Sequence, residues 1–388
     1  MKSLFKILLS VALLTCVHLT MAQETKIRFF GQPEITNSHI KHTSEYGGVN
    51  EFGQYVKTDT SYTKTNFNSG DFVLFVTSQL NERISVLSEV SFNNSGEEST
   101  FELQRLMLRY YIKDYFSLRV GRMFTPIGYW NNQFTLGLVL QPTIQRPMAI
   151  RPVSDGGVLQ YRDNGIQFEG ENITNARFFY KVLIANGVGY FGSNEKRDNH
   201  VATTVQVGAE PVEGLKVLVS GMFDRIEKGK SNPNGSISSL PDDGNLELFV
   251  ASAAYMNPSS KFEFIGELLS QKSKFENVGT FSSYSYYGYA GFRATNALTP
   301  YVLYNSSKAG KSRTEGDPYF SPIPVKIDLL TVGARYKFNS SFVAKLEYEI
   351  NEEKYYYQDI MLGGTKLDDG FTSTMKNNSI RLQLAFVF

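Results

Sequence analysis

The sequence predicts an all-β protein: a transmembrane antiparallel β-barrel of about 16 strands. Three observations support this prediction. Many short segments alternate apolar and polar residues with a period of two, short and long connections follow one another along the chain, and the N-terminus has the features of an export signal. In such a barrel the short connections are periplasmic turns and the long ones are extracellular loops.

Residues 1–22 have the organisation of a signal peptide. Lys2 and Lys6 form a charged n-region, residues 7–17 form an apolar stretch, and small residues precede a cleavage site that we place after Ala22. A short membrane anchor is an alternative, but the apolar stretch is too short to span a bilayer comfortably. We therefore expect the signal peptide to be cleaved and the mature protein to be exported.

Residues 23–388 are expected to form a single transmembrane barrel domain. Cleavage removes the only cysteine, Cys16, so the mature chain has no disulfide and no Cys-based metal site. It also removes two of the 39 basic residues and none of the 38 acidic ones, which changes the net charge from +1 to 37 − 38 = −1. This balance gives no strongly basic surface, so we expect no nucleic-acid partner.

The C-terminal segment shows the period-two pattern most clearly. Apolar side chains stand at every second position from Ile380 to Phe388, and Arg381, Gln383 and Ala385 stand between them. This is a strand with one apolar face. Similar alternation recurs around residues 84–92, 177–184, 215–223 and 342–350. Because ionised side chains at every second position cannot fill a dry core, the opposite face must be wet.

The connections between the segments alternate in length. Seven are short and eight are long and polar, so fifteen connections join sixteen strands, and both chain ends lie on the side of the short turns. The first two strands are expected at 26–35 and 72–80, with a long loop over 36–71. The last two are expected at 342–351 and 379–388, with a long loop over 352–378.

Aromatic residues flank several of the short turns. Tyr110 and Tyr115 bracket one turn, and Phe338 and Phe342 bracket another. Repeated placement at strand ends is typical of the girdle at a membrane interface, although scattered core residues of a soluble sheet would explain some of them. In lipid every backbone N–H and C=O must be paired, so a spanning sheet has to close. An even, antiparallel barrel with an export signal fits a bacterial outer-membrane protein.

Three arginines are expected to face the aqueous lumen of this barrel. Arg105 and Arg109 are four residues apart on one strand, and Arg119 follows on the next strand, so three guanidinium groups share one neighbourhood. This set is suited to attracting anions. Glu89 on the preceding strand is a candidate partner, and a solvated wall of lateral ion pairs is the alternative interpretation.

The longest connection, about residues 124–164, is expected to fold inward as a constriction loop. It carries no charge before Arg146 and Arg151, and a loop this apolar should not lie in water. A loop that contacts a receptor or another subunit is the alternative. Arg146 and Arg151 join the candidate pore lining. The candidate constriction residues are Phe124, Pro126, Gly128, Tyr129, Trp130 and Phe134.

The sequence carries none of the enzyme motifs that we sought. There is no G-x-S-x-G, no phosphate-binding loop, no H-E-x-x-H and no Cys–His set. His39 and His42 stand beside Lys41, where a solvated loop is a simpler interpretation than a metal site. We therefore expect no enzyme activity, no cofactor and no bound metal.

Two stretches resemble the phosphate-selective porin (O/P-like) family. The run R-V-G-R-M-F-T-P-I-G from Arg119 to Gly128 resembles the family's Gly…Pro-x-Gly segment, and Arg162 with Gly165 and Gly170 resembles the opening of its next strand. The resemblance implies a homotrimer of passive channels. Members that select phosphate carry an Arg ladder and a Lys cluster in the pore. The lining here is mixed in sign and shows no Lys cluster, which argues against phosphate selectivity.

The sequence therefore predicts an outer-membrane porin that passes small polar solutes or ions, with a mild anion preference. A barrel that serves as an adhesin or scaffold with a plugged lumen is the second hypothesis, and a barrel hydrolase is the third. The expected partners are outer-membrane lipid, small solutes or anions, further copies of the chain and the barrel-assembly machinery. Phe386 and Phe388 resemble the C-terminal signal that this machinery reads.

Overall fold

The computed structural model describes most of the chain from residue 24 onward. The described ranges are 24–44, 57–94, 99–134, 140–152, 159–187, 200–228, 242–277, 279–309, 326–357, 360–362, 365–368 and 371–388. The expected signal peptide, residues 1–22, lies outside these ranges. No helix among the described residues is long and apolar enough to cross a membrane.

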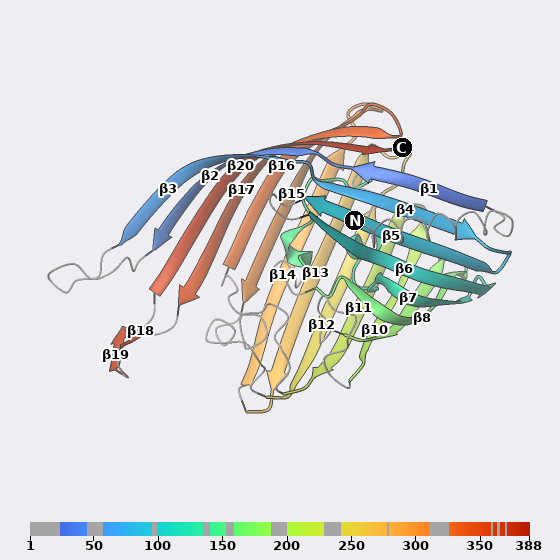
Figure 1. Ribbon diagram of the computed structural model, residues 1–388, viewed down its shortest axis with the longest axis horizontal. Coiled ribbons are helices and arrows are strands. Elements are labelled where there is room, and N and C mark those ends of the chain that lie inside the picture. Colours follow the sequence, from blue (N-terminus) through green and yellow to red (C-terminus); the bar gives the residue numbers. More distant parts are fainter. Residues whose placement is uncertain are drawn as a thin grey trace, which may run out of the picture.

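Strands dominate the structure (Figure 1). The main sheet contains β1 (Glu24–Gly31), β2 (Glu34–Ser44), β3 (Thr58–Asn68), β4 (Asp71–Gln79), β5 (Ile84–Asn94), β6 (Ser99–Lys113), β7 (Phe116–Phe124), β8 (Arg162–Ile173), β9 (Phe178–Ala185), β10 (Ala202–Val212), β11 (Leu215–Ile226), β12 (Gly244–Tyr255), β13 (Phe262–Phe275), β14 (Gly279–Phe292), β15 (Leu298–Ala309), β16 (Lys326–Lys337), β17 (Phe342–Tyr357) and β20 (Phe371–Val387). A small hairpin of β18 (Ile360–Leu362) and β19 (Thr365–Asp368) lies apart from it.

Two pairs of these elements form single transmembrane strands. Only Gln32 and Pro33 separate β1 from β2, and only Ser69 and Gly70 separate β3 from β4. β1 pairs with β4 and β2 pairs with β3, with the register shifted by one residue between the two ladders. Pro33 has no N–H to donate, which accounts for the interruption of the ladder. The barrel therefore has 16 transmembrane strands, as the sequence predicted.

The sheet is antiparallel and closes on itself. Strands that are neighbours in sequence are paired, and β20 returns to pair with β2, from Glu34 opposite Gln383 to Ser44 opposite Ser373. At the short-turn end of this seam, Phe29 and Phe388 exchange backbone hydrogen bonds of 2.9 and 3.0 Å. The Phe388 ring stacks on Phe29 and on Phe386. Closure pairs the backbone groups that lipid could not satisfy.

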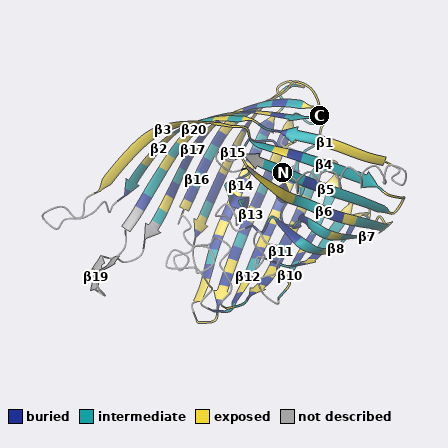
Figure 2. Cartoon of the chain, in the orientation of Figure 1, coloured by how far each residue is buried: buried dark blue, intermediate teal, exposed yellow. Residues whose placement is uncertain are grey.

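Buried and exposed residues alternate along many strands (Figure 2), and the exposed outer face carries many large apolar side chains, as the alternation predicts. On β20, Ile380, Leu382 and Leu384 are exposed, while Gln383 and Ala385, at alternate positions, are buried inside the barrel. Exposed aromatic side chains gather near the short turns of the outer face. They include Tyr115, Phe262, Phe292, Tyr336 and Phe338. This arrangement matches the aromatic girdle expected at a membrane interface.

Several strands continue farther toward the long loops than the sequence predicted. The range 36–71, expected to be loop, contains most of β2 and all of β3, and the range 352–378 contains the ends of β17 and β20. All 11 residues of β3 are exposed, on both faces (Figure 2). A strand exposed on both faces has no reason to alternate apolar and polar residues, so the period-two pattern disappears there.

The inner wall differs from the uniformly wet face that the sequence predicted. On β10–β15 many inward side chains are apolar and buried, among them Met222, Leu246, Leu248, Ile265 and Leu269. Buried polar side chains such as Gln206 and Glu267 stand between them, so this part of the inner face is packed and not wet. The outer face meets lipid, and the inner face is covered by the long connection between β7 and β8.

Candidate pore and constriction loop

The connection between β7 and β8, residues 125–161, lies against the inner wall, and we call it the inner loop. It is shorter at both ends than the range of 124–164 expected from the sequence. Phe124 is the last residue of β7, and residues 162–164 already belong to β8. Its described parts include the short helix α2 (Trp130–Gln133) and the 3₁₀ turn η1 (Met148–Ile150).

Apolar side chains fix the first part of the inner loop to the wall. Trp130 is fully buried and packs edge-on against Phe134 and against Tyr287 of β14, with ring centroids 5.0 and 5.9 Å apart. Tyr129 and Pro126 are also buried. These aromatic side chains of the expected constriction loop therefore pack against the barrel wall.

Glu267 of β13 holds the backbone at the start of α2. Its carboxylate accepts hydrogen bonds from the N–H groups of Tyr129 and Trp130, the latter at 3.1 Å. Gly128 precedes them with φ of +66°, a conformation that glycine adopts readily. The Gly128 carbonyl accepts a bond from Gln206 at 3.1 Å. Burial, followed by the nearby carboxylates of Glu210 and Glu267, raises the pKa of Tyr129 to about 12.

A second anchor lies on β17, four strands beyond β13 in the order of the sheet. Glu347 accepts a hydrogen bond of 2.7 Å from the Ile144 N–H and another of 2.7 Å from the Tyr301 hydroxyl. Lys345 donates to the Thr143 carbonyl at 3.1 Å. The inner loop thus crosses the lumen from the β10–β13 side to β17.

Two large cavities remain in the lumen, and a smaller one of about 140 Å³ lies between the inner loop and the wall, lined by Tyr129, Asn132, Arg109 and Glu169 among others. The upper cavity, toward the long loops, has a volume of about 560 Å³, and the lower cavity, toward the short turns, has a volume of about 410 Å³. Glu89 lines the upper cavity and its ion-pair partner Arg105 lines the lower one, with 2.8 Å between Glu89 Oε2 and Arg105 Nε. This pair therefore stands at the boundary between the cavities. The Arg105 guanidinium also lies 4.6 Å from the centre of the Phe124 ring.

Arg109 and Arg119 line the lower cavity with Arg105, so the structure brings the three predicted arginines together. Each of them has a carboxylate partner. Arg119 lies 2.7 Å from Glu169, and Arg109 lies 3.3 Å from Glu169 and 3.4 Å from Glu171. The side chains of Arg109 and Arg119 remain 30% and 26% exposed, so their charges still reach the water in the cavity.

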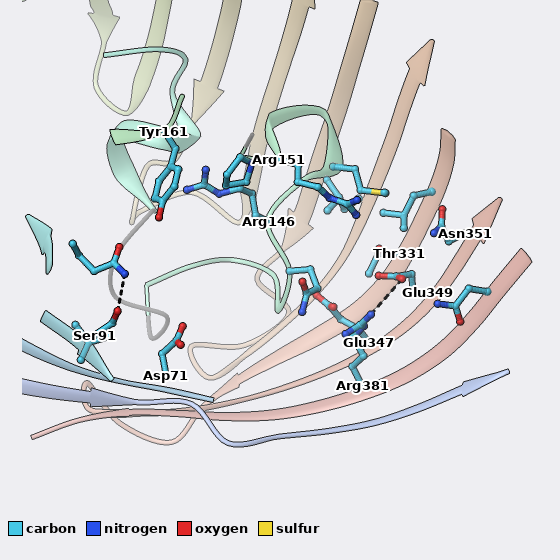
Figure 3. Close-up of a pocket in the computed structure, with 18 of the residues that line it drawn as sticks. Asp71, Ser91, Arg146, Arg151, Tyr161, Thr331, Glu347, Glu349, Asn351 and Arg381 are labelled. Atoms are coloured by element: carbon cyan, nitrogen blue, oxygen red, sulfur yellow. Dashed lines mark hydrogen bonds and ion pairs between the residues drawn. The ribbon is translucent and has the colours of Figure 1, made fainter. Parts of the chain in front are cut away.

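Opposite charges face each other across the upper cavity (Figure 3). The inner loop contributes Arg146 and Arg151, and the barrel wall contributes Glu347 and Glu349, with Arg381 lying 3.6 Å from Glu349. Across the whole lining, six carboxylates outnumber three arginines: Asp71, Glu89, Glu102, Glu347, Glu349 and Glu353 against Arg146, Arg151 and Arg381. Among the described residues, no cluster of His, Cys, Asp or Glu is arranged to hold a metal ion.

No protein-family model matches the sequence, and no curated protein matches it. Solved structures do match the fold. The anion-selective porin from Comamonas acidovorans is 12% identical, with a TM-score of 0.59, and covers 94% of this chain and 100% of its own. OmpF of Salmonella typhi, in complex with daunomycin, is 11% identical, with a TM-score of 0.57, and the match covers 95% of this chain and 99% of OmpF. The trimer form of OmpT, an outer-membrane protein of Vibrio cholerae, is 14% identical, with a TM-score of 0.55, and the match covers 94% of this chain and 100% of OmpT.

The chain has the fold of the bacterial outer-membrane porins, a closed transmembrane β-barrel with short turns at one end and long loops at the other. At these identities the likeness extends to the fold and does not single out the phosphate-selective family that the two sequence stretches resemble.

Sequence reasoning missed the anchoring role of the wall residues that hold the inner loop. Glu267, Lys345 and Glu347 stand at inward positions of their strands, where charged side chains are typical of a pore wall. Their partners lie more than 130 residues away in sequence, so no local pattern could reveal them. The apolar inner wall did leave a signal. In residues 246–255 both alternating sets are largely apolar, which is typical of a strand covered on both faces.

Proposed function

We propose that this protein is an outer-membrane porin that lets small polar solutes or ions diffuse through the barrel. The observation that carries the proposal is the pair of polar-lined cavities in the lumen of a closed barrel. The inner loop acts as the constriction, because it crosses the lumen and is held at two separate points of the wall. An adhesin or scaffold would need no such water-filled space.

The predicted anion preference is weak in this proposal. Arg105, Arg109 and Arg119 supply positive charge to the lower cavity, but Glu89 and Glu169 neutralise part of it, and carboxylates outnumber arginines in the upper cavity. Fields inside a narrow lumen are stronger than in bulk water, so unpaired charge there controls ion selectivity. We propose that the arginines offset the carboxylates and keep the channel close to unselective.

A homotrimer is the proposed assembly. The trimer form of the similar OmpT supports this proposal, as does the family resemblance noted in the sequence. The mass of the purified protein in detergent, with the detergent contribution subtracted, tests it directly.

Single-channel recording in a planar bilayer tests the proposed channel. The purified protein should produce discrete, persistent conductance steps. Replacing Arg105, Arg109 and Arg119 by Ser should shift the zero-current potential in a salt gradient toward cation selectivity, because Glu89 and Glu169 lose their partners. Arg225→Ser, on the outer face, is the matched control and should leave the potential unchanged.

Two results would argue against this assignment. A folded barrel without conductance steps would favour the adhesin or scaffold hypothesis. An open triple variant with the wild-type zero-current potential would show that the three arginines serve only to hold the wall together.

A further inference from the structure

Five lysines point outward from adjoining strands near the long-loop end of the barrel. All five are exposed, and they share the outward side of their strands with exposed residues such as Ile350, Ile380 and Val332. We call them the lysine row. It consists of Lys308 on β15, Lys326 on β16, Lys354 on β17, Lys376 on β20 and Lys41 on β2.

The pairing of the strands places these like charges directly opposite one another. Lys326 is the cross-strand partner of both Lys308 and Lys354, and Lys376 is the partner of Lys41. Like charges in directly opposite positions destabilise an antiparallel pair. Their recurrence across five adjoining strands is therefore a cost to the isolated barrel, and a negatively charged ligand would remove it.

Carboxylates on the same surface neutralise the lysine row only in part. Lys326 pairs with Asp328, and Glu352 lies 3.3 Å from Lys354 and 3.1 Å from Lys376. Asp59 stands diagonally opposite Lys41 on β3. Three carboxylates against five lysines leave a net charge of 5 − 3 = +2. Among the described residues, no carboxylate forms an ion pair with Lys308 or Lys41.

The position of the lysine row along the strands places it beside lipid headgroups. The outward residues Leu346, Tyr348 and Ile350 are exposed and mostly apolar, and Lys354 follows four positions after Ile350. At about 3.3 Å per residue and a tilt of roughly 40°, this is on the order of 10 Å above the apolar band. Headgroups occupy that depth, and the long loops mark the outer leaflet.

We propose that the lysine row binds the phosphate groups of a phosphorylated lipid in the outer leaflet of the outer membrane. The phosphates would serve as counter-ions for directly opposed lysines, while the acyl chains lie along the apolar outer face below. The observation is independent of the lumen, so this site can exist whether or not the barrel conducts.

Native mass spectrometry of the purified barrel in detergent tests this site, with diphosphoryl lipid A as the probe. The variant Lys308→Gln, Lys326→Gln, Lys354→Gln removes three charges from the row. A lysine near an anionic lipid surface is worth roughly fivefold in affinity, so binding should weaken by at least about tenfold. The matching Lys→Arg variant should keep most of the affinity, and added salt should weaken wild-type binding.

The control variant is Lys26→Gln, Lys113→Gln, Lys261→Gln, which removes the same number of charges at the opposite end of the barrel. It should bind diphosphoryl lipid A like wild type. Equal affinity for diphosphoryl and dephosphorylated lipid A would overturn the proposal. An equal loss of lipid A affinity in the control variant would also overturn it. If the lysine-row variant kept its lipid A affinity but no longer formed trimers, the row would instead belong to the contact between copies of the chain.

Discussion

Charged residues of the inner wall mostly hold other groups in place. Glu89 and Glu169 hold arginines, and Glu267 and Glu347 hold the backbone of the inner loop. A buried carboxylate that accepts hydrogen bonds in this way is costly to leave without partners. Alternation in the sequence shows that such a residue faces inward, but the choice between a pore field and a structural bond depends on a distant segment.

Gly128 offers a test of the inner loop at the scale of one residue. It has φ of +66°, and a Cβ atom there would lie 2.9 Å from both carboxylate oxygens of Glu267. Gly128→Ala should therefore weaken the attachment of the loop, by roughly 1–3 kcal/mol for the backbone strain alone. Limited proteolysis of the folded barrel should then cut within residues 125–161 faster than in wild type.

Gly288→Ala is the matched control for this change. Gly288 lies on β14, and nothing stands within 4 Å of the position its Cβ would take. It should leave the cleavage rate unchanged. If Gly128→Ala is cut at the wild-type rate as well, the loop does not depend on this close approach.

At the scale of elements, the inner loop and strands β10–β15 form one packed unit. The loop covers their inward side chains, which leaves the polar wall from β16 through β20 and on to β7 to line most of the two cavities. The sequence predicted an inward loop from its lack of charge. It did not predict which wall the loop covers, because that depends on contacts between segments far apart in the chain.

The anchor at β17 can be released separately from the one at β13. Glu347→Leu removes the acceptor for the Ile144 N–H and the Tyr301 hydroxyl, a loss of roughly 1–3 kcal/mol for each group left unpaired. We expect the loop to move more freely, so single-channel recordings should show a higher mean conductance and more open-channel noise.

Removing a carboxylate from the upper cavity could by itself change conductance, and Glu353→Leu controls for this. Glu353 also lines the upper cavity, but the hydrogen bonds that it accepts there come from Asn351 and Tyr355 on its own strand. Similar traces from the two variants would mean that charge, and not loop attachment, governs the current.

At the scale of the whole molecule, the architecture was the most predictable feature. Lipid requires an apolar outer face and a closed set of backbone hydrogen bonds, so the strand number and the alternation of turns and loops are visible in the sequence. This constraint ends where the strands leave the apolar layer. The outer halves, such as β3, were therefore expected to be loop, although they continue the barrel.

The outer face of β20 provides the test of this architecture. Leu384 is exposed on the outer face, next to Ala385, which is fully buried inside. Leu384→Arg would place a charge against lipid, at a cost of up to about 2–4 kcal/mol at the bilayer midplane. Asn378→Arg is the control, because Asn378 is an outward residue of the same strand. It lies two positions from Lys376, near the headgroups, where the cost falls to roughly 0–1 kcal/mol.

The measurement is the folded fraction in lipid vesicles, followed by the heat-dependent shift in gel mobility. Leu384→Arg should fold less completely than Asn378→Arg at equal urea concentration. Equal folding of both variants would mean that β20 does not present this face to lipid, and the orientation of the closing seam would have to be revised.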